Sequence, residues 1–129
     1  MILVIDPAVD FGKLTAQALQ QINLQAVVAT TAQEAILAVD NAKPKLIILE
    51  LAMAEHNGLE FLYELRSHAD LLHVPVIIYS HIAAEELGLS KSQQSRLGIA
   101  AHFYKPRTNL KTLLDFAHEL TNSKAHAAA

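Results

Sequence analysis

The chain of 129 residues contains neither cysteine nor tryptophan. Without cysteine it can form no disulfide and no thiolate metal site, which fits a reducing compartment. No apolar run approaches the roughly 20 residues that a membrane-spanning helix needs. The N-terminal run at residues 2–5 lacks the basic lead-in and the cleavage site of a signal peptide. We therefore expect a cytoplasmic protein that does not contact a membrane.

A strong charge of one sign is also missing. Ten Lys and Arg residues against 13 Asp and Glu leave a formal net charge of -3, so nothing draws the chain to nucleic acid. A hydrophobic content of 52% with 18% charged residues excludes disorder as the main description. The length fits one domain. We predict a single domain over residues 1–121 and a flexible C-terminal tail over 122–129, where no packing pattern is present.

Short apolar runs alternate with longer segments of helical periodicity. The runs predict strands at residues 2–5, 24–29, 46–49, 76–79 and 100–104. The intervening segments predict helices at 9–22, between Thr31 and Pro44, at 59–66, at 83–97 and at 110–120, with Gly88 interrupting the fourth. Because the central strands are apolar throughout, we expect helices on both of their faces. The pattern predicts a three-layer α/β/α fold around a doubly wound, five-stranded parallel sheet.

Four polar side chains follow different predicted strands. Asp6, Glu50, Ser80 and Lys105 stand where strands end, and ligands of such sheets collect at the carboxyl ends of the strands. Two carboxylates, a hydroxyl and an ammonium are the groups needed to phosphorylate a carboxylate. One acid accepts the phosphoryl group and neighbouring acids hold a divalent cation, while the hydroxyl and the ammonium bind phosphoryl oxygens.

Three stretches carry a family resemblance: LIILELAMAEHNG at 46–58, VPVIIYS at 74–80 and FYKP at 103–106. In this order the chain resembles the receiver domain of two-component response regulators from about residue 2 to 120. The resemblance implies a flavodoxin-like receiver fold. It also implies that Ser80 is the switch hydroxyl and that Lys105 is the lysine of the family's Lys-Pro step, whose peptide bond is often cis in the family.

The departures from this family decide the expected function. Glu50 replaces the phosphoacceptor aspartate, and Pro7 replaces the second acid after Asp6, the more important magnesium ligand, so the acidic pocket is vestigial. His102 replaces the aromatic switch residue of the fifth strand. We therefore expect a pseudo-receiver that is no enzyme, is not phosphorylated and acts by binding a protein partner. The alternative is an atypical phosphoacceptor, or a small-molecule sensor that uses the strand-end pocket.

Each of these residues also has a simpler interpretation. Glu50 either imitates a phosphoaspartate or is retained only to pair with Lys105, and the pairing is favoured. Lys105 is then an ion-pair partner without a catalytic role, and Ser80 bonds to the local backbone. We expect no cofactor and weak or no magnesium binding, with Asp6, Glu50 and the Ala52 carbonyl as weak candidate ligands. For His102, a solvent-exposed substitution without consequence is favoured over a pH-dependent role.

The family's usual interaction face predicts where a partner binds. It combines the fourth helix, the fifth strand and the fifth helix, and here it would use five residues: Gln93, Arg96, His102, Arg107 and Lys111. A histidine kinase or another regulator could occupy it, and a homodimer is an alternative. The sequence leaves open the pathway, the oligomeric state, the origin of the Ala-rich end and whether the chain is a fragment of a larger regulator.

Overall fold

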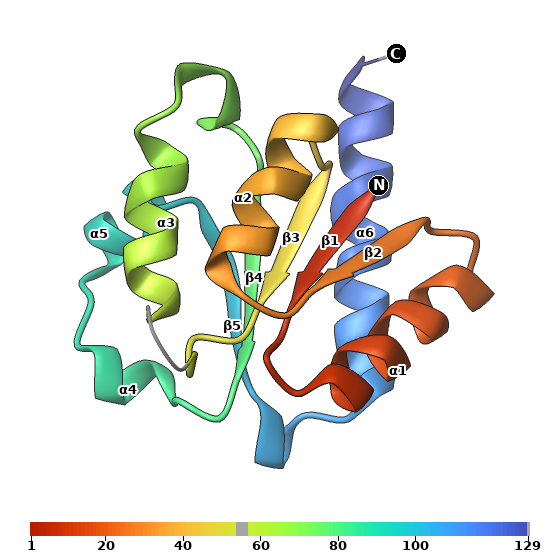
Figure 1. The fold of residues 1–129 in the computed structure, drawn as a ribbon, viewed down its shortest axis with the longest axis horizontal. Helices are drawn as coiled ribbons and strands as arrows, with labels where there is room; N and C mark the ends of the chain where they lie inside the picture. The colour runs from red at the N-terminus through yellow and green to blue at the C-terminus, as the bar shows by residue number, and fades with distance from the viewer. Residues whose placement is uncertain (54–56, 129) are drawn as a thin grey trace.

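Five parallel strands form one sheet in the order β2-β1-β3-β4-β5 (Figure 1). The computed structural model describes residues 1–53 and 57–128, and side chains as far as residue 122. The strands are β1 (Ile2–Ile5), β2 (Ala26–Ala29), β3 (Leu46–Leu49), β4 (Val76–Ser80) and β5 (Ile99–Tyr104). This order is that of a flavodoxin-like sheet, and it confirms the fold class predicted from the alternating pattern.

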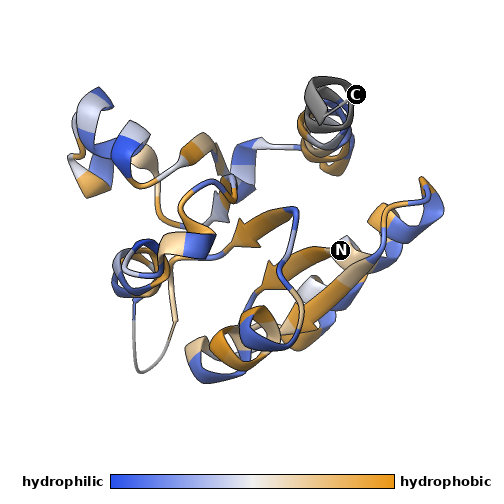
Figure 2. Ribbon diagram, turned by 90° about the horizontal axis from the view of Figure 1, so that it is seen from above, coloured by the Kyte–Doolittle hydropathy of each residue, from blue (hydrophilic) through white to orange (hydrophobic). Residues whose placement is uncertain are grey.

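Helices cover both faces of this sheet. They are α1 (Val9–Gln21), α2 (Ala32–Asn41), α3 (Gly58–Arg66), α4 (Ala84–Leu87), α5 (Lys91–Arg96) and α6 (Leu110–Ala128), with two 3-10 turns, η1 (Ala69–Leu71) and η2 (Lys105–Arg107). Two apolar cores result. One face of the sheet packs against α1 and α6, and the other packs against α2, α3 and the end of α5. In Figure 2 the central strands are mainly orange, and the helices carry blue residues on their outward sides.

The strand and helix boundaries follow the predictions closely, and the differences have local causes. β2 begins at Ala26 instead of residue 24 because the turn that ends α1 includes the preceding residues. Asn23 adopts a left-handed conformation with φ of 66°, and the N–H of Leu24 bonds back to the carbonyl of Leu19 at 3.0 Å. The segment predicted as one interrupted helix is two short helices. Gly88, with φ of 63°, ends α4, and Ser90 caps α5 by accepting the N–H of Gln93.

The terminal helix is longer than predicted. α6 continues to Ala128, whereas the periodic apolar pattern ends at Leu120. Leu113 and Ala117 are its fully buried residues and attach it to the sheet. The apolar spacing therefore marks the part of the helix that packs, and the helical backbone extends into the segment predicted as a tail.

Candidate functional site

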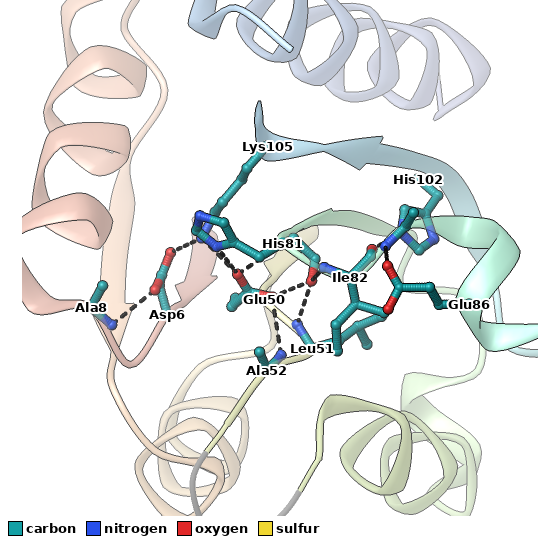
Figure 3. Close-up of polar contacts among 12 residues, drawn as sticks. Asp6, Ala8, Glu50, Leu51, Ala52, His81, Ile82, Glu86, His102 and Lys105 are labelled. Carbon is teal, nitrogen blue, oxygen red and sulfur yellow. Dashed lines mark hydrogen bonds and ion pairs between the residues drawn. The ribbon is translucent and has the colours of Figure 1, made fainter. Parts of the chain in front are cut away.

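The carboxyl ends of four strands bring the predicted polar residues together. Asp6 follows β1, Glu50 follows β3, Ser80 ends β4 and Lys105 follows β5. These ends meet next to the point where strand order reverses, between β1 and β3. All four residues are buried, with exposed fractions from 0% for Ser80 to 8% for Lys105. Figure 3 shows the side chains of Asp6, Glu50 and Lys105 pointing toward one another. We call the four residues, together with His81, the strand-end cluster.

The carboxylate of Glu50 is the centre of this cluster. Its Oε2 atom accepts the N–H of Ala52 at 3.0 Å and a very short hydrogen bond from the hydroxyl of Ser80. Its Oε1 atom accepts the N–H of His81 at 3.1 Å and the ammonium of Lys105 at 3.0 Å. Backbone donors, a hydroxyl and an ammonium thus surround one buried anion (Figure 3).

Lys105 joins the two acids. Its Nζ atom lies 2.7 Å from Oδ2 of Asp6 and 3.0 Å from Oε1 of Glu50. Two aromatic rings flank the same ammonium, with the ring centroids of Phe11 and Tyr79 at 4.4 and 5.5 Å. The predicted pairing of Lys105 with Glu50 is present, whereas neither ring nor the bond to Asp6 was predicted. The Lys105–Pro106 peptide bond is trans, although a cis bond is frequent in the family.

Asp6 is satisfied within its own loop as well as by Lys105. Its Oδ1 atom accepts the N–H of Ala8 at 2.9 Å, and Oδ2 accepts the ammonium. Pro7, which lies between Asp6 and Ala8 in the sequence, is exposed and offers no side-chain oxygen. Every carboxylate oxygen of Asp6 and Glu50 therefore already has a donor within the chain.

Ser80 bonds both to Glu50 and to the local backbone. Its hydroxyl donates to Glu50, and its Oγ atom also accepts the N–H of Ile82 at 2.9 Å. The N–H of Leu51 is a weaker third contact at 3.4 Å. Ser80 thus bonds to the backbone that follows it while it points toward the residue after β3.

Hydrogen bonding controls the charge of Glu50. Burial alone would raise the pKa of this carboxyl. The donors around it, from the backbone of Ala52 and from Ser80, Lys105 and His81, outweigh burial and lower the pKa from 4.5 to about 2. Glu50 is therefore an anion at neutral pH, although it is only 3% exposed.

Two histidines make contacts near the strand ends. His81 has a side chain that is 64% exposed, yet its Nδ1 atom lies 3.0 Å from Oε1 of Glu50. Because an ionised carboxylate only accepts, Nδ1 must carry the proton. His102 is half-buried, and its Nε2 atom lies 2.7 Å from the carbonyl oxygen of Ile82. The favoured interpretation of His102 as a solvent-exposed substitution is therefore wrong, because its ring ties β5 to the loop after β4.

The loop after β3 holds Glu50 and Leu51 against the start of α3. The N–H of Gly58 bonds to the carbonyl of Leu51 at 2.9 Å, and a Cβ atom at Gly58 would lie 2.8 Å from the Leu51 Cα. Asn57 caps α3 by accepting the N–H of Glu60 at 2.9 Å. Residues 54–56 of the stretch that carries the family resemblance lie outside the described residues.

The predicted interaction face surrounds the edge strand β5. Arg96 on α5, Arg107 on η2 and Lys111 on α6 are exposed. Gln93 is half-buried and is used in capping α5, since its Oε1 atom accepts the N–H of Ser90 at 2.8 Å. Lys111 forms an exposed ion pair with Asp115 at 3.1 Å. Of the five predicted residues, Arg96, Arg107 and Lys111 are therefore exposed cations, while Glu85 and Glu86 on α4 add exposed acids to the same face.

The described part of the chain lacks two features. Over residues 1–53 and 57–128, no helix combines the length and the apolar character needed to cross a membrane. Among the side chains described, those of residues 1–53 and 57–122, no three His, Cys, Asp or Glu are grouped as metal ligands.

Comparison with known proteins identifies the family. The model of the response regulator receiver domain matches residues 2–115, so the chain belongs to that family. Receiver domains are signalling modules of two-component systems and in general are not enzymes. No curated protein matches the chain.

Several solved structures share the fold at low sequence identity. A sensor protein from Polaromonas sp. JS666 is 20% identical with a TM-score of 0.82, over 94% of this chain and 95% of that one. The chemotaxis protein CheY4 of Vibrio cholerae is 21% identical with a TM-score of 0.80, over 92% and 96%. The response regulator TrrA of Thermotoga maritima, solved in complex with Mg2+-BeF, is 22% identical with a TM-score of 0.75, over 92% and 96%.

Proposed function

We propose that this receiver domain is a pseudo-receiver, which signals by binding a protein partner without being phosphorylated. The observation that carries the proposal is the closed hydrogen bonding of Glu50. The hydroxyl and the ammonium that the family resemblance assigns to phosphoryl oxygens are both bonded to the Glu50 carboxylate. An incoming phosphoryl group would have to displace these donors from a buried anion.

The same geometry argues against a resident magnesium ion. A divalent cation of this kind takes oxygen ligands from carboxylates and water. Here the ammonium of Lys105 lies between Asp6 and Glu50, and each carboxylate oxygen already accepts a hydrogen bond. Pro7 supplies no further ligand. The residues present do not fit the ion, and we infer that the domain functions without it.

The contacts of Glu50 also bear on its role as a mimic. Simple retention for pairing requires only the bond to Lys105. The structure adds Ser80, His81 and a backbone N–H, so that one carboxylate keeps the switch hydroxyl turned toward position 50. We infer that the switch residues Ser80 and His102 stay in one arrangement and that partner binding is constitutive. The face around β5, with the exposed cations Arg96 and Arg107, is the surface that we assign to this partner.

Incubation with acetyl phosphate and magnesium, followed by intact-mass spectrometry, tests the central claim. The wild-type chain should gain no phosphoryl group. The matched control is the double variant Pro7→Asp with Glu50→Asp, which restores the family's acids and should form an adduct under the same conditions. A stable single adduct on Glu50 of the wild type would overturn the proposal.

A further inference from the structure

An open groove separates α2 and α3, on the side of the sheet away from α1 and α6. Side chains of both helices line a cavity of about 450 Å³, which we call the α2–α3 groove: Ala32, Gln33, Ile36 and Leu37 of α2, and Glu60, Phe61 and Glu64 of α3. Figure 1 shows the two helices side by side. A smaller hollow shares Ile36, Phe61 and Glu64 and continues along α2 to Asp40. From residue 32 to residue 40 the helix rises about 12 Å, which is about two turns.

The groove has an apolar floor and an exposed apolar edge. Phe61 is 2% exposed and belongs to the core, and Ile36 packs against the same core. Leu37 stands 58% exposed at the rim, although leucine is normally buried. The apolar floor and Leu37 together therefore offer an apolar ligand a surface to cover.

The charges along the groove have one sign. Glu60 and Glu64 line it, and Asp40 lines the adjoining hollow. Within the described residues, no lysine or arginine lines either hollow, and Asp40 and Glu64 have no ion-pair partner. Acidic rims around an apolar floor are complementary to a helix with an apolar stripe and basic flanks.

We propose that the α2–α3 groove docks a basic amphipathic helix of a partner protein. This surface is separate from the face around β5 to which the proposed function assigns its partner, so either can be present without the other. A second copy of this chain fits less well. Its cations at Arg96 and Arg107 lie around β5, so copies would join head to tail and not through the self-complementary patch of a two-fold dimer, which is the commonest oligomer.

The test uses the full chain and a labelled helical peptide of about 14 residues, with leucine at positions i, i+3, i+4 and i+7 and lysine elsewhere. Titration into ¹⁵N-labelled protein should shift amide resonances of residues 32–40 and 60–68. Binding should weaken as salt is added, because the charges are exposed. A peptide with glutamate in place of each lysine should bind at least tenfold more weakly.

Matched variants distinguish binding in the groove from non-specific binding of the peptide. Leu37→Glu and Glu64→Lys should each lower the affinity for the lysine peptide at least tenfold. Tyr63→Glu is the control, because Tyr63 is 55% exposed on α3 and does not line the groove, and it should bind the peptide as the wild type does. A circular-dichroism melt shows that each variant is folded.

Three outcomes would overturn the proposal. The first is shifts that map to the β5 face or the strand ends. The second is equal binding of the acidic peptide, or equal binding by all three variants. The third is a concentration-dependent dimer of the protein alone, seen by sedimentation with shifts at residues 32–40, because the occupant would then be a second copy.

Discussion

The strand-end cluster and the α2–α3 groove lie on one domain, but their acidic side chains differ in burial and in partners. In the cluster, Asp6 and Glu50 are buried, and a lysine, a histidine, a serine and backbone donors satisfy them. Along the groove, Asp40 and Glu64 stand without ion-pair partners among the described residues, beside the exposed Leu37.

The contrast indicates where this domain can still form contacts. The cluster stands where the family carries its phosphorylation chemistry, and it has become internally complete. No buried side-chain nitrogen or oxygen of the described residues lacks a hydrogen-bond partner. A group that already has its partners gains little from a ligand, whereas an acidic, partly apolar surface gains from one. We therefore expect variants of the cluster to change stability and variants of the groove to change binding.

The largest effect should come from Lys105→Met. Removing the ammonium leaves two buried carboxylates facing each other without a counterion, which costs about 3–5 kcal/mol of the free energy of unfolding. Urea denaturation measures the loss. Lys111→Met is the matched control, because its pair with Asp115 is exposed, and it should cost about 0.5 kcal/mol or less. Similar losses in the two variants would show that the cluster is not tightly coupled.

The next largest effect on stability should appear at low pH. The pKa of Glu50 is lowered from 4.5 to about 2 in the folded state, so the unfolded chain takes up its proton first as the pH falls. The stability that Glu50 contributes is full above pH 4.5 and is lost as the pH falls toward 2. It amounts to roughly 3 kcal/mol. Denaturation at pH 6, 4 and 3 measures the slope, and a flat profile would contradict the assigned hydrogen bonds.

Glu50→Gln should have a smaller effect, of about 2 kcal/mol. The amide keeps one acceptor oxygen for its neighbours, and Asp6 still pairs with Lys105, so no charge is left without a partner. If Glu50 orders the switch, the amide resonances of Ser80 and His102 should also shift or broaden in this variant. Unchanged resonances with a lower stability would favour simple pairing over phosphoaspartate mimicry. Exchange broadening around His102 in the wild type would contradict a single arrangement.

The sequence predicted the sheet and the four polar residues of the cluster because both depend on short-range patterns. Apolar runs mark strands, and the first polar residue after each run marks its carboxyl end. The partners that complete the cluster depend instead on side-chain direction across strands. Nothing in the sequence indicates that the ring of Phe11 reaches Lys105, or that His81 turns toward Glu50 while most of its side chain stays exposed.

The end of α6 and the long-range contacts of Arg66 were not predicted, for related reasons. The apolar spacing ends at Leu120 because the packed face ends near there, yet the helical backbone continues. Arg66 donates to the carbonyl oxygens of Leu71, Val74 and Leu97 and so joins α3, the loop after it and the end of α5. These acceptors are backbone atoms, which leave no trace in residue identity. The α2–α3 groove likewise depends on the spacing between two helices.

The smallest effect on stability is expected from variants of the groove. Leu37 is 58% exposed, so Leu37→Ser removes little buried surface. Asp40 and Glu64 lie on a surface with several acids, so replacing one of them, as in Glu64→Gln, relieves repulsion. Both variants should therefore change the free energy of unfolding by about 0.5 kcal/mol or less, and Glu64→Gln should raise it if it changes at all. Urea denaturation of Glu64→Gln and Glu50→Gln in parallel compares the loss of an exposed carboxylate with the loss of a buried one. A loss above about 1 kcal/mol in Glu64→Gln would show that the groove acid has a structural partner, and the surface would then be no better suited to a ligand than the strand-end cluster.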